Sequence, residues 1–405
     1  MEGVEAPAPP AAAQAPHGLF PVAGRESPPG HVPGVLPAPF LMPSYGDACL
    51  DSLVPALMAP PGGRPSWLPA PASVAGQVVL LVLDGLGWLQ LQERAHVAPV
   101  LAGLEGGPLS SVAPTTTATA LSSLTLGTTP AGHGILGYKF LVNGPSGREI
   151  LNALRWTTVS GDARQFLPPA QAQPLPAFGG HSVPVVSRAD FAGTGFSQAH
   201  QRGGRDVGWV VPSSMPPLVR DVLGQGHPFV YAYYDGIDKV AHATGLGDLY
   251  SAELAFVDQM VSALLSVLPP GAALVVTADH GQVDASARAR PVVPQVAAEA
   301  QLMSGDARFR WLHSRPGRAD ALFERAASAY GDEAWVATRE QVVSTGILGG
   351  VPSPEACERL GDVVMVPYGG DAYLDPGDGG DARLICRHGG LSADEMLVPL
   401  LAGSA

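Results

Sequence analysis

Cysteine is scarce in this 405-residue sequence, and its three copies, Cys49, Cys357 and Cys386, show no paired spacing. Neither a disulfide framework nor a zinc site built from cysteine pairs is indicated. Basic charge is scarce as well, because 23 lysine and arginine residues stand against 36 acids and give a formal net charge of −13. Without a basic surface, binding of nucleic acid through charge is not expected. An acidic protein that handles anions needs local positive charge, and metal ions are one source of it.

Long hydrophobic runs are also missing. The most apolar stretch, QVVLLVLDGLGWL at residues 77–89, is too short to cross a bilayer and contains Asp84. The first residues, MEGVEAPAPPAAAQAPHG, carry acids and prolines where a signal peptide would have a basic start and an apolar core. We therefore expect a cytoplasmic protein without membrane attachment.

Glycine and proline, at 50 and 41 residues, predict long loops around a core supplied by 46% hydrophobic residues. This amount of apolar material is enough for one large α/β domain or two smaller ones. Residues 1–35 are rich in proline and alanine and are predicted to form a disordered tail. The remaining residues, 36–405, are predicted to fold, with insertions around 140–228 and 285–360 that cover a site.

Apolar runs and amphipathic segments alternate along the folded part. Strands are predicted within 76–87, 108–114, 227–238, 271–281, 334–338, 361–367 and 381–390. Helices are predicted within 45–60, 88–104, 117–127, 251–269 and 319–331, the third of them closed by Gly127. This alternation predicts the α/β class, with a mostly parallel central sheet and helices on both faces.

Acids and histidines stand where four of these strands end. They are Asp84, Asp235, Asp238, Asp279, His280 and His388, with His242 four residues beyond Asp238 on one face of a helical turn. In open α/β sheets, ligands bind beyond the carboxyl ends of the strands. Carboxylates and imidazoles are metal ligands, and six of them suffice for two ions that clamp a phosphoryl group.

Four threonines, Thr115, Thr116, Thr117 and Thr119, crowd behind Pro114 at a predicted helix start. A threonine hydroxyl is a poor nucleophile until metal coordination lowers its pKa. A helix N-terminus adds free N–H groups for phosphate oxygens. One of these hydroxyls could therefore carry chemistry, and local reasoning leaves open which one.

Taken together, the motifs resemble the alkaline phosphatase superfamily, most closely its type I phosphodiesterase / nucleotide pyrophosphatase family. They are LDG at Asp84, PTTT at 114–117, Gly127, HG at His133, DKVAH at 238–242, ADHG at 278–281 and RHGG at 387–390. They follow the order of the family through most of the chain. The resemblance implies an alkaline phosphatase-like catalytic domain over 36–405.

The resemblance also implies roles for single residues. The nucleophile of the family is the second threonine of P-T-x-T, ten residues before a glycine that precedes H-G by six, and Thr117 matches this spacing. Two divalent ions, with zinc as the first choice, are implied as cofactors, although His/Asp sites also accept manganese or iron. One ion would bind Asp238, His242 and His388, and the other would bind Asp84, Asp279 and His280. Asp235 would be a neighbour of the site.

The implied activity is hydrolysis of a phosphodiester or pyrophosphate through a phosphothreonine on Thr117. The substrate would be a small phosphoester or a nucleotide-like molecule. Two departures bring nucleotide specificity into question: Ala118 replaces a phenylalanine that stacks on the base, and Tyr138 replaces an asparagine that donates to a phosphoryl oxygen. Tyr138 either takes over that donation or only packs.

Two alternatives remain open at this stage. The first is a phosphomonoesterase on the same site, which would need a further cation, for which Arg148 or Arg155 could serve. The second is a metal- or phosphate-binding protein without turnover.

Overall fold

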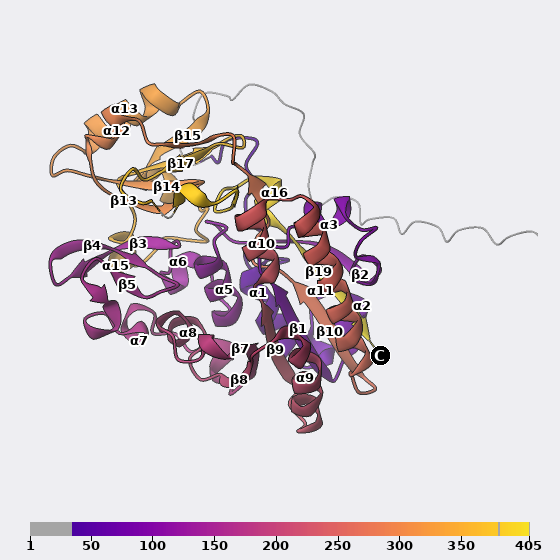
Figure 1. Cartoon of the computed structure of the whole chain (residues 1–405). Coiled ribbons are helices and arrows are strands. Elements are labelled where there is room, and N and C mark those ends of the chain that lie inside the picture. Colours follow the sequence, from indigo (N-terminus) through magenta and orange to yellow (C-terminus); the bar gives the residue numbers. More distant parts are fainter. Residues whose placement is uncertain (1–34, 380, 405) are drawn as a thin grey trace, which may run out of the picture.

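The computed structural model describes residues 35–379 and 381–404 (Figure 1). The disordered tail predicted for residues 1–35 lies outside the described residues except for Val35. No helix in the described part of the chain combines the length and the hydropathy that a membrane span requires.

A seven-stranded sheet forms the centre of the molecule (Figure 1). In spatial order its strands are β2 (Glu105–Ser110), β19 (Leu397–Ser404), β10 (Ala272–Thr277), β1 (Gln77–Leu83), β9 (Phe229–Tyr234), β7 (Pro184–Arg188) and β8 (Arg205–Trp209). The run from β10 to β8 is parallel, and only β19 lies antiparallel to its neighbours. The predicted α/β class with a mostly parallel central sheet is confirmed.

The three middle strands explain why the sheet forms here. β9 and β10 are buried throughout, and β1 is buried after its first residue. Leu80 of β1 pairs with Val275 on one side and with Tyr231 on the other. Continuous apolar runs of this kind suit strands that are covered on both faces.

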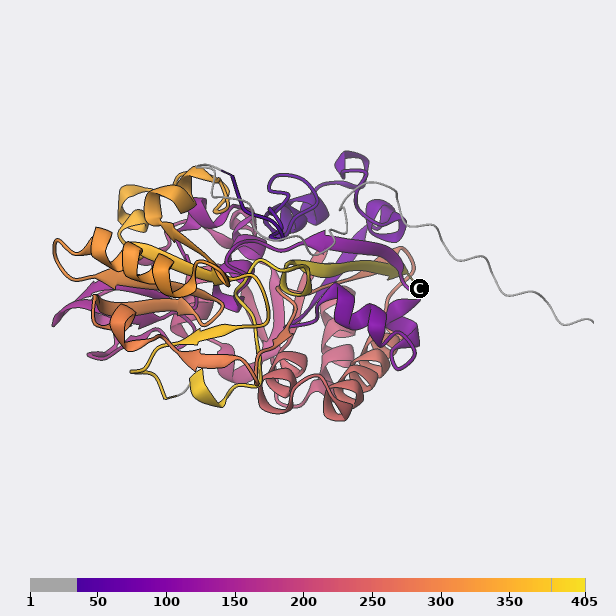
Figure 2. The ribbon, with the colours of Figure 1, turned by 90° about the horizontal axis from the view of Figure 1, so that it is seen from above.

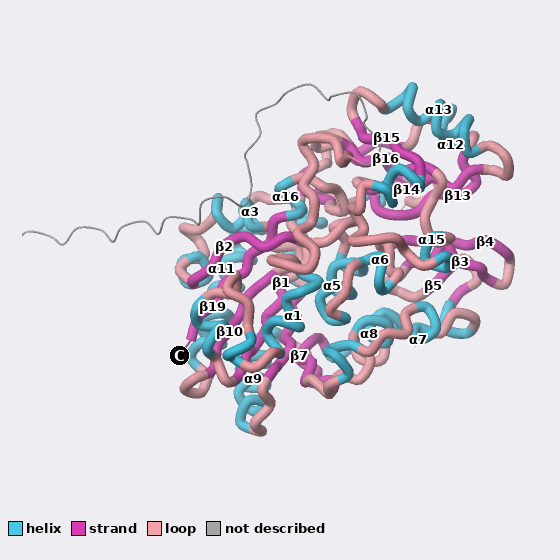
Figure 3. Tube along the Cα trace, turned by 180° about the vertical axis from the view of Figure 1, so that it is seen from behind, coloured by secondary structure: helices cyan, strands magenta, loops and turns pink. Residues whose placement is uncertain are grey.

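Helices cover both faces of the sheet (Figures 1 and 3). One face carries α1 (Leu50–Met58) and α5 (Thr117–Leu126), with α6 (Pro130–His133), α7 (Pro169–Ala172) and α8 (Gly195–His200) beyond α5. The other carries α9 (Met215–Gly224), α10 (Gly236–Thr244) and α11 (Asp248–Ser266), with α3 (Trp88–Glu93), α4 (Pro99–Ala102) and α16 (Ala393–Met396) toward β19. The short helix α2 (Ala70–Val74) packs against β19 and β10. The turn that ends α5 places Gly127 at φ 64°, as its predicted closing role requires.

The single helix predicted over 88–104 is wrong, because the structure has two short helices there. α3 ends at Glu93 and α4 begins at Pro99. Proline has no N–H to donate and starts a helix more readily than it continues one.

The strand predicted over 381–390 is also mostly wrong. The segment contains one short strand, β18 (Cys386–Arg387), which pairs with β11 (Val283–Asp284), and Gly389 forms an isolated bridge with Thr115. The sequence prediction missed β19, which contains Pro399. Proline weakens a strand assignment because it cannot donate to the ladder. In the structure β10 pairs only with residues 401–404 of β19, so Pro399 lies outside that ladder.

The insertion predicted around 140–228 differs from the structure, because residues 184–209 provide β7 and β8 of the central sheet. What lies apart from that sheet is a four-stranded antiparallel sheet of β3 (Lys139–Gly144), β4 (Gly147–Asn152), β5 (Thr157–Thr158) and β6 (Gly161–Asp162).

Most of the second predicted insertion, 285–360, belongs to a separate region beside the central sheet (Figure 2). Its four-stranded antiparallel sheet, called here the second sheet, extends past residue 360. It consists of β13 (Ala300–Asp306), β14 (Phe309–Ser314), β16 (Val363–Pro367) and β15 (Ala334–Thr338). Around it lie α12 (Pro294–Ala297), α13 (Ala319–Tyr330), α14 (Arg339–Ser344), α15 (Pro354–Cys357), and the parallel pair of β12 (Ala289–Pro291) and β17 (Ala372–Leu374).

Candidate active site

The predicted polar residues meet at the carboxyl ends of β1, β9 and β10. Asp84 directly follows β1, and Asp279 and His280 follow β10. Asp238 lies in the first turn of α10, just after β9. His388 comes from the loop after β18. Parallel strands end at the same edge of a sheet, so three segments that are distant in sequence contribute to one site.

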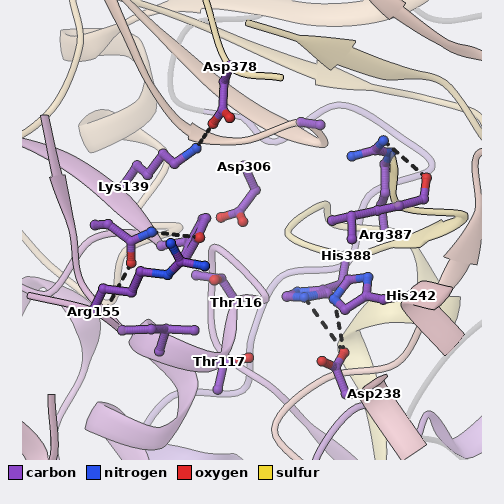
Figure 4. Close-up of a pocket in the computed structure, with 15 residues that line it drawn as sticks. Thr116, Thr117, Lys139, Arg155, Asp238, His242, Asp306, Asp378, Arg387 and His388 are labelled. Carbon is purple, nitrogen blue, oxygen red and sulfur yellow. Dashed lines mark hydrogen bonds and ion pairs between the residues drawn. The ribbon is translucent and has the colours of Figure 1, made fainter. Parts of the chain in front are cut away.

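Asp238, His242 and His388 form the first cluster of candidate metal ligands (Figure 4). One ligand atom from each lies within 4.8 Å of the others. His242 Nε2 is 3.2 Å from Asp238 Oδ1, and His388 Nε2 is 4.0 Å from the same oxygen. These are the three residues predicted to share one ion.

Asp84, Asp238 and His280 form the second cluster, in which one ligand atom from each residue again lies within 4.8 Å of the others. His280 Nε2 is 3.4 Å from Asp84 Oδ1 and 3.5 Å from Asp279 Oδ2. Asp279, which was predicted to be a ligand here, lies against the cluster and accepts hydrogen bonds at Oδ1 from the backbone N–H groups of Gly85 and His280. Asp238 thus lies between two groups of ligand atoms, where the sequence predicted two separate sets of three.

Two carboxylate oxygens of this edge, Asp84 Oδ1 and Asp279 Oδ2, are buried and accept no hydrogen bond. Burial raises the pKa of Asp84, and the charges of Asp279 and Asp238 raise it further. Burial also raises the pKa of Asp279, to about 6. Buried carboxylates that repel one another and lack donors are costly unless a cation neutralises them. The donor set therefore fits a divalent metal ion.

The three histidines are oriented in the same way. Nδ1 of His242 lies 2.8 Å from the carbonyl oxygen of Cys386, and Nδ1 of His280 lies 3.0 Å from that of Gly281. Nδ1 of His388 lies 2.9 Å from the carbonyl oxygen of Thr115. A carbonyl only accepts, so this hydrogen bonding assigns the proton to Nδ1 and leaves the Nε2 lone pair facing the site. Metal-binding histidines are typically held by such backbone contacts.

Burial keeps two of these imidazoles neutral. It lowers the pKa of His280 to about 4. It lowers the pKa of His388 to about 3, with a further contribution from neighbouring His280. Both rings are therefore in the form that can donate a lone pair to a metal at neutral pH.

Thr117 is the first residue of α5, and its hydroxyl lies 3.1 Å from His280 Nε2. Thr115 is held by the loop that carries His388, because its hydroxyl donates to the carbonyl of Gly390 and accepts from the N–H of Gly389. Among the candidate threonines, Thr117 is thus the one whose hydroxyl contacts a predicted metal ligand. Its place at a helix start also brings it to backbone N–H groups that have no partner within a helix.

Two cavities meet at Thr117. The smaller cavity measures about 470 Å³. It is lined by the first cluster and by Thr116, Thr117, Tyr138, Lys139 and Asp306 (Figure 4). The larger measures about 670 Å³ and is lined by Asp84, Phe191, Phe196, Tyr233 and neighbouring residues. Thr117, Leu154, Arg155 and Asp238 line both cavities. Thr117 therefore borders both cavities.

Three other residues named from the sequence are placed as follows. Tyr138 lies in the wall of the smaller cavity, where Asn152 donates a 2.7 Å hydrogen bond to its hydroxyl. Asp235 lies beside the clusters and pairs with Arg188 at 3.1 Å and with Lys239 at 2.5 Å. His133 bridges α6 and α5 by a 2.9 Å hydrogen bond to Ser123.

Sequence analysis missed two side chains that hold the clusters. Tyr233, the penultimate residue of β9, donates its hydroxyl proton to Asp84 Oδ2. Gln282 donates from Nε2 to Asp238 Oδ1 over 2.6 Å. Their positions next to a strand end were the available signal, since the same strand ends carry the acids and histidines.

Comparison with known proteins gives a family match over most of the chain. A family model described as type I phosphodiesterase / nucleotide pyrophosphatase matches residues 78–220 and 215–370, most of the chain. His388 lies beyond the matched residues, so its place in the site rests on the geometry. No curated protein matches the sequence significantly.

Solved structures show the same fold at low sequence identity. Murine ectonucleotide pyrophosphatase / phosphodiesterase 5 superposes with a TM-score of 0.62 and 16% identity, covering 81% of this chain and 88% of that one. The human protein of the same name superposes with a TM-score of 0.62 and 15% identity, and it covers the same shares of the two chains. Phosphonoacetate hydrolase from Sinorhizobium meliloti 1021 superposes with a TM-score of 0.59 and 18% identity, covering 82% of this chain and 91% of that one.

Metal removal is expected to destabilise the protein, because the buried oxygens of Asp84 and Asp279 then lack a counter-charge. A cation present at 100 times its dissociation constant adds about 2.7 kcal/mol to the free energy of unfolding. Thermal unfolding in chelator and in excess Zn²⁺ measures this difference, and the midpoint should fall on chelation and recover with zinc. The same midpoint in both conditions would contradict a metal site.

Replacing Tyr233 by phenylalanine is expected to weaken zinc binding by about 10- to 100-fold, the range found when a residue supporting a metal ligand is lost. The substitution keeps the ring and removes the hydroxyl that donates to Asp84. Calorimetric titration with Zn²⁺ measures the effect. Tyr234→Phe is the matched control, because that hydroxyl donates to Glu253 instead. Equal zinc affinity of the Tyr233→Phe variant and the unaltered protein would count against the assigned support.

Proposed function

Because the chain belongs to the type I phosphodiesterase / nucleotide pyrophosphatase family, a family of phosphoric ester hydrolases, we propose that it is a metal-dependent phosphodiesterase or pyrophosphatase with Thr117 as its nucleophile. The observation that carries this proposal is the position of the Thr117 hydroxyl. It lies at a helix start, 3.1 Å from His280, beside two clusters of carboxylate and imidazole ligands.

The residues of the two clusters would hold two divalent cations, with zinc as the first choice for imidazole and carboxylate donors. When bound, such cations lower the pKa of a hydroxyl or a water and neutralise phosphoryl oxygens. The remaining steps of the proposal involve this chain's own groups.

In the first step, Thr117 Oγ1 attacks the phosphorus atom of the substrate and gives up its proton to solvent water. The bond from phosphorus to the leaving oxygen breaks, and the leaving group departs as a phosphate or, after its oxygen takes up a proton from water, as an alcohol. The phosphoryl group, with the substituent that stays on it, is then esterified to Thr117. In the second step, water attacks the same phosphorus and releases Thr117 and the product.

The start of α5 would bind the phosphoryl oxygens during both steps. Backbone N–H groups in the first turn of a helix point outward and carry a partial positive charge. They lie next to Thr117 by their place in the chain. Fixed donors of this kind stabilise the charge that develops on the phosphoryl group.

The two cavities support a substrate with two substituents. In an in-line displacement the attacking and leaving oxygens lie on opposite sides of phosphorus. Thr117 borders two cavities, which leaves room for both the leaving group and the substituent that stays on phosphorus. The larger cavity has Phe191 and Phe196 in its wall. They could provide aromatic surface that Ala118 does not. We propose small phosphodiesters or pyrophosphates as the substrate class, without assigning a nucleotide base.

Substitution of Thr117 by alanine is the direct test of the nucleophile. On bis-p-nitrophenyl phosphate, with metal-loaded protein, we expect kcat to fall by at least about a thousandfold, as for removal of other catalytic nucleophiles. Thr128→Ala, two residues beyond the far end of α5, serves as the control and should keep its activity. Activity that survives in Thr117→Ala would exclude this mechanism.

A specific observation also favours a second candidate, a phosphomonoesterase on the same site. A monoester carries one more negative charge than a diester, and Arg155 lines both cavities beside Thr117. Arg148, the other arginine considered from the sequence, lines a separate cavity with Arg339 and Arg359. Arg155 is therefore the candidate for binding the additional charged oxygen.

Replacing Arg155 by methionine distinguishes the two candidates. Loss of a hydrogen bond to a charged group costs about 1.5–3 kcal/mol, or roughly a 10- to 100-fold loss in kcat/KM. If Arg155 binds the extra charge, this loss should occur on p-nitrophenyl phosphate, with a much smaller one on bis-p-nitrophenyl phosphate. Arg148→Met is the control. Equal losses on both substrates would argue against a role in monoester recognition.

A further inference from the structure

A fully buried ion pair connects the second sheet to the metal-ligand clusters. Arg308 lies in the turn between β13 and β14, and Glu395 lies in α16. Their side chains are 1% and 0% exposed. The contact is bidentate, with Arg308 Nε donating to Glu395 Oε1 at 2.7 Å and Nη2 donating to Oε2 at 2.8 Å.

Both members of the pair are further satisfied. Glu395 accepts from the backbone N–H of Gly390 at 2.8 Å and from the hydroxyl of Ser392 at 2.6 Å. Arg308 Nη1 donates to the carbonyl oxygens of Gly369 and Asp371. The pair therefore joins the loop after His388 to the region of the second sheet through hydrogen bonds.

The loop passes this restraint to His388. The carbonyl of Gly390, whose N–H is held by Glu395, accepts from the hydroxyl of Thr115 at 2.7 Å. The carbonyl of Thr115 in turn accepts the Nδ1 proton of His388 at 2.9 Å. Each hydrogen bond from Glu395 to the imidazole ring thus shares a residue with the next, and the last one sets where the Nε2 lone pair points.

The two glycines after His388 show how closely this loop is packed. A Cβ atom on Gly390 would lie 2.6 Å from Glu395 Oε2. Gly389 has φ +112°, and a Cβ there would lie 2.8 Å from Cβ of Asp306, the last residue of β13. Glycine therefore lets the loop lie against Glu395 and against the end of β13.

Stability alone does not account for such a pair. Burying two charges costs several kcal/mol each, and well-packed apolar residues often serve a fold equally well. A role in placing a functional group explains why the charges are present. His388 is the group at the other end of the hydrogen-bond chain.

We propose that Arg308 and Glu395 are positioning residues that hold His388 in place for the cation site of Asp238, His242 and His388. The turn between β13 and β14 then supports the metal centre from a distance, although neither residue contacts the site itself. This inference rests on the proposed metal dependence.

Zinc titration of the full-length Glu395→Gln variant tests the proposal. Glutamine keeps the shape of the side chain but turns one of the two acceptors toward Arg308 into a donor. We expect one of two zinc sites to weaken by about 10- to 100-fold, with the other unchanged. Glu299→Gln is the matched control, because Glu299 makes a bidentate pair with Arg318 in the same region but on the surface. Its two zinc affinities should stay within about threefold of the unaltered protein.

A second variant covers the case in which Glu395→Gln fails to fold. The double replacement Arg308→Met with Glu395→Leu removes both charges together, which buried pairs tolerate better than the loss of one. It leaves the N–H of Gly390 without its acceptor, so we expect the same loss at one zinc site. Circular dichroism and thermal unfolding establish that the titrated protein is folded.

The outcomes are distinguishable. A folded variant of either kind that binds two zinc ions as tightly as the unaltered protein overturns the positioning role and leaves the proposed function standing. An unaltered protein that binds no zinc or other divalent ion contradicts the proposed metal dependence, and this inference with it.

Discussion

Charge repulsion among buried carboxylates is the constraint that the rest of the site has to meet. Asp84 Oδ1 and Asp279 Oδ2 are enclosed by protein and accept no hydrogen bond, and Asp238 adds a third acid beside them. Three strands of the central sheet end here, so the fold itself brings the acids together. A divalent cation would compensate such a group without a new donor. The arrangement of the neighbouring side chains follows from this need.

The histidines beside these carboxylates direct the lone pairs of Nε2, and not N–H groups, toward the site. Three histidines donate hydrogen bonds from Nδ1–H to backbone carbonyl oxygens, and Nε2 of each ring faces the site. The Tyr233 hydroxyl and the Gln282 amide each satisfy one carboxylate oxygen from outside the clusters. Arg308 and Glu395 extend this support into the second sheet. Catalysis by a threonine requires such preorganisation, because the hydroxyl alone is a weak nucleophile at neutral pH.

Sequence patterns predicted the parts of this site that depend on local chain properties. The buried runs of β1, β9 and β10 are recognisable from composition, and polar residues at their ends lie together because parallel strands share an edge. Contacts over long sequence distances could not be predicted. Arg308 and Glu395 are 87 residues apart, and nothing in either segment alone indicates a partner. β19 was missed for a similar reason, since the position of Pro399 outside the β10 ladder is a property of the assembled sheet.

The proposed mechanism depends on a covalent bond between Thr117 and phosphorus during turnover. Acid quenching of metal-loaded protein a few milliseconds after mixing with bis-p-nitrophenyl phosphate, followed by mass spectrometry of its peptides, detects this bond directly. We expect a p-nitrophenyl phosphoryl group on Thr117 and on no other threonine. Turnover without any modified threonine under the same conditions, or with the group on Thr115 or Thr116, would contradict the mechanism.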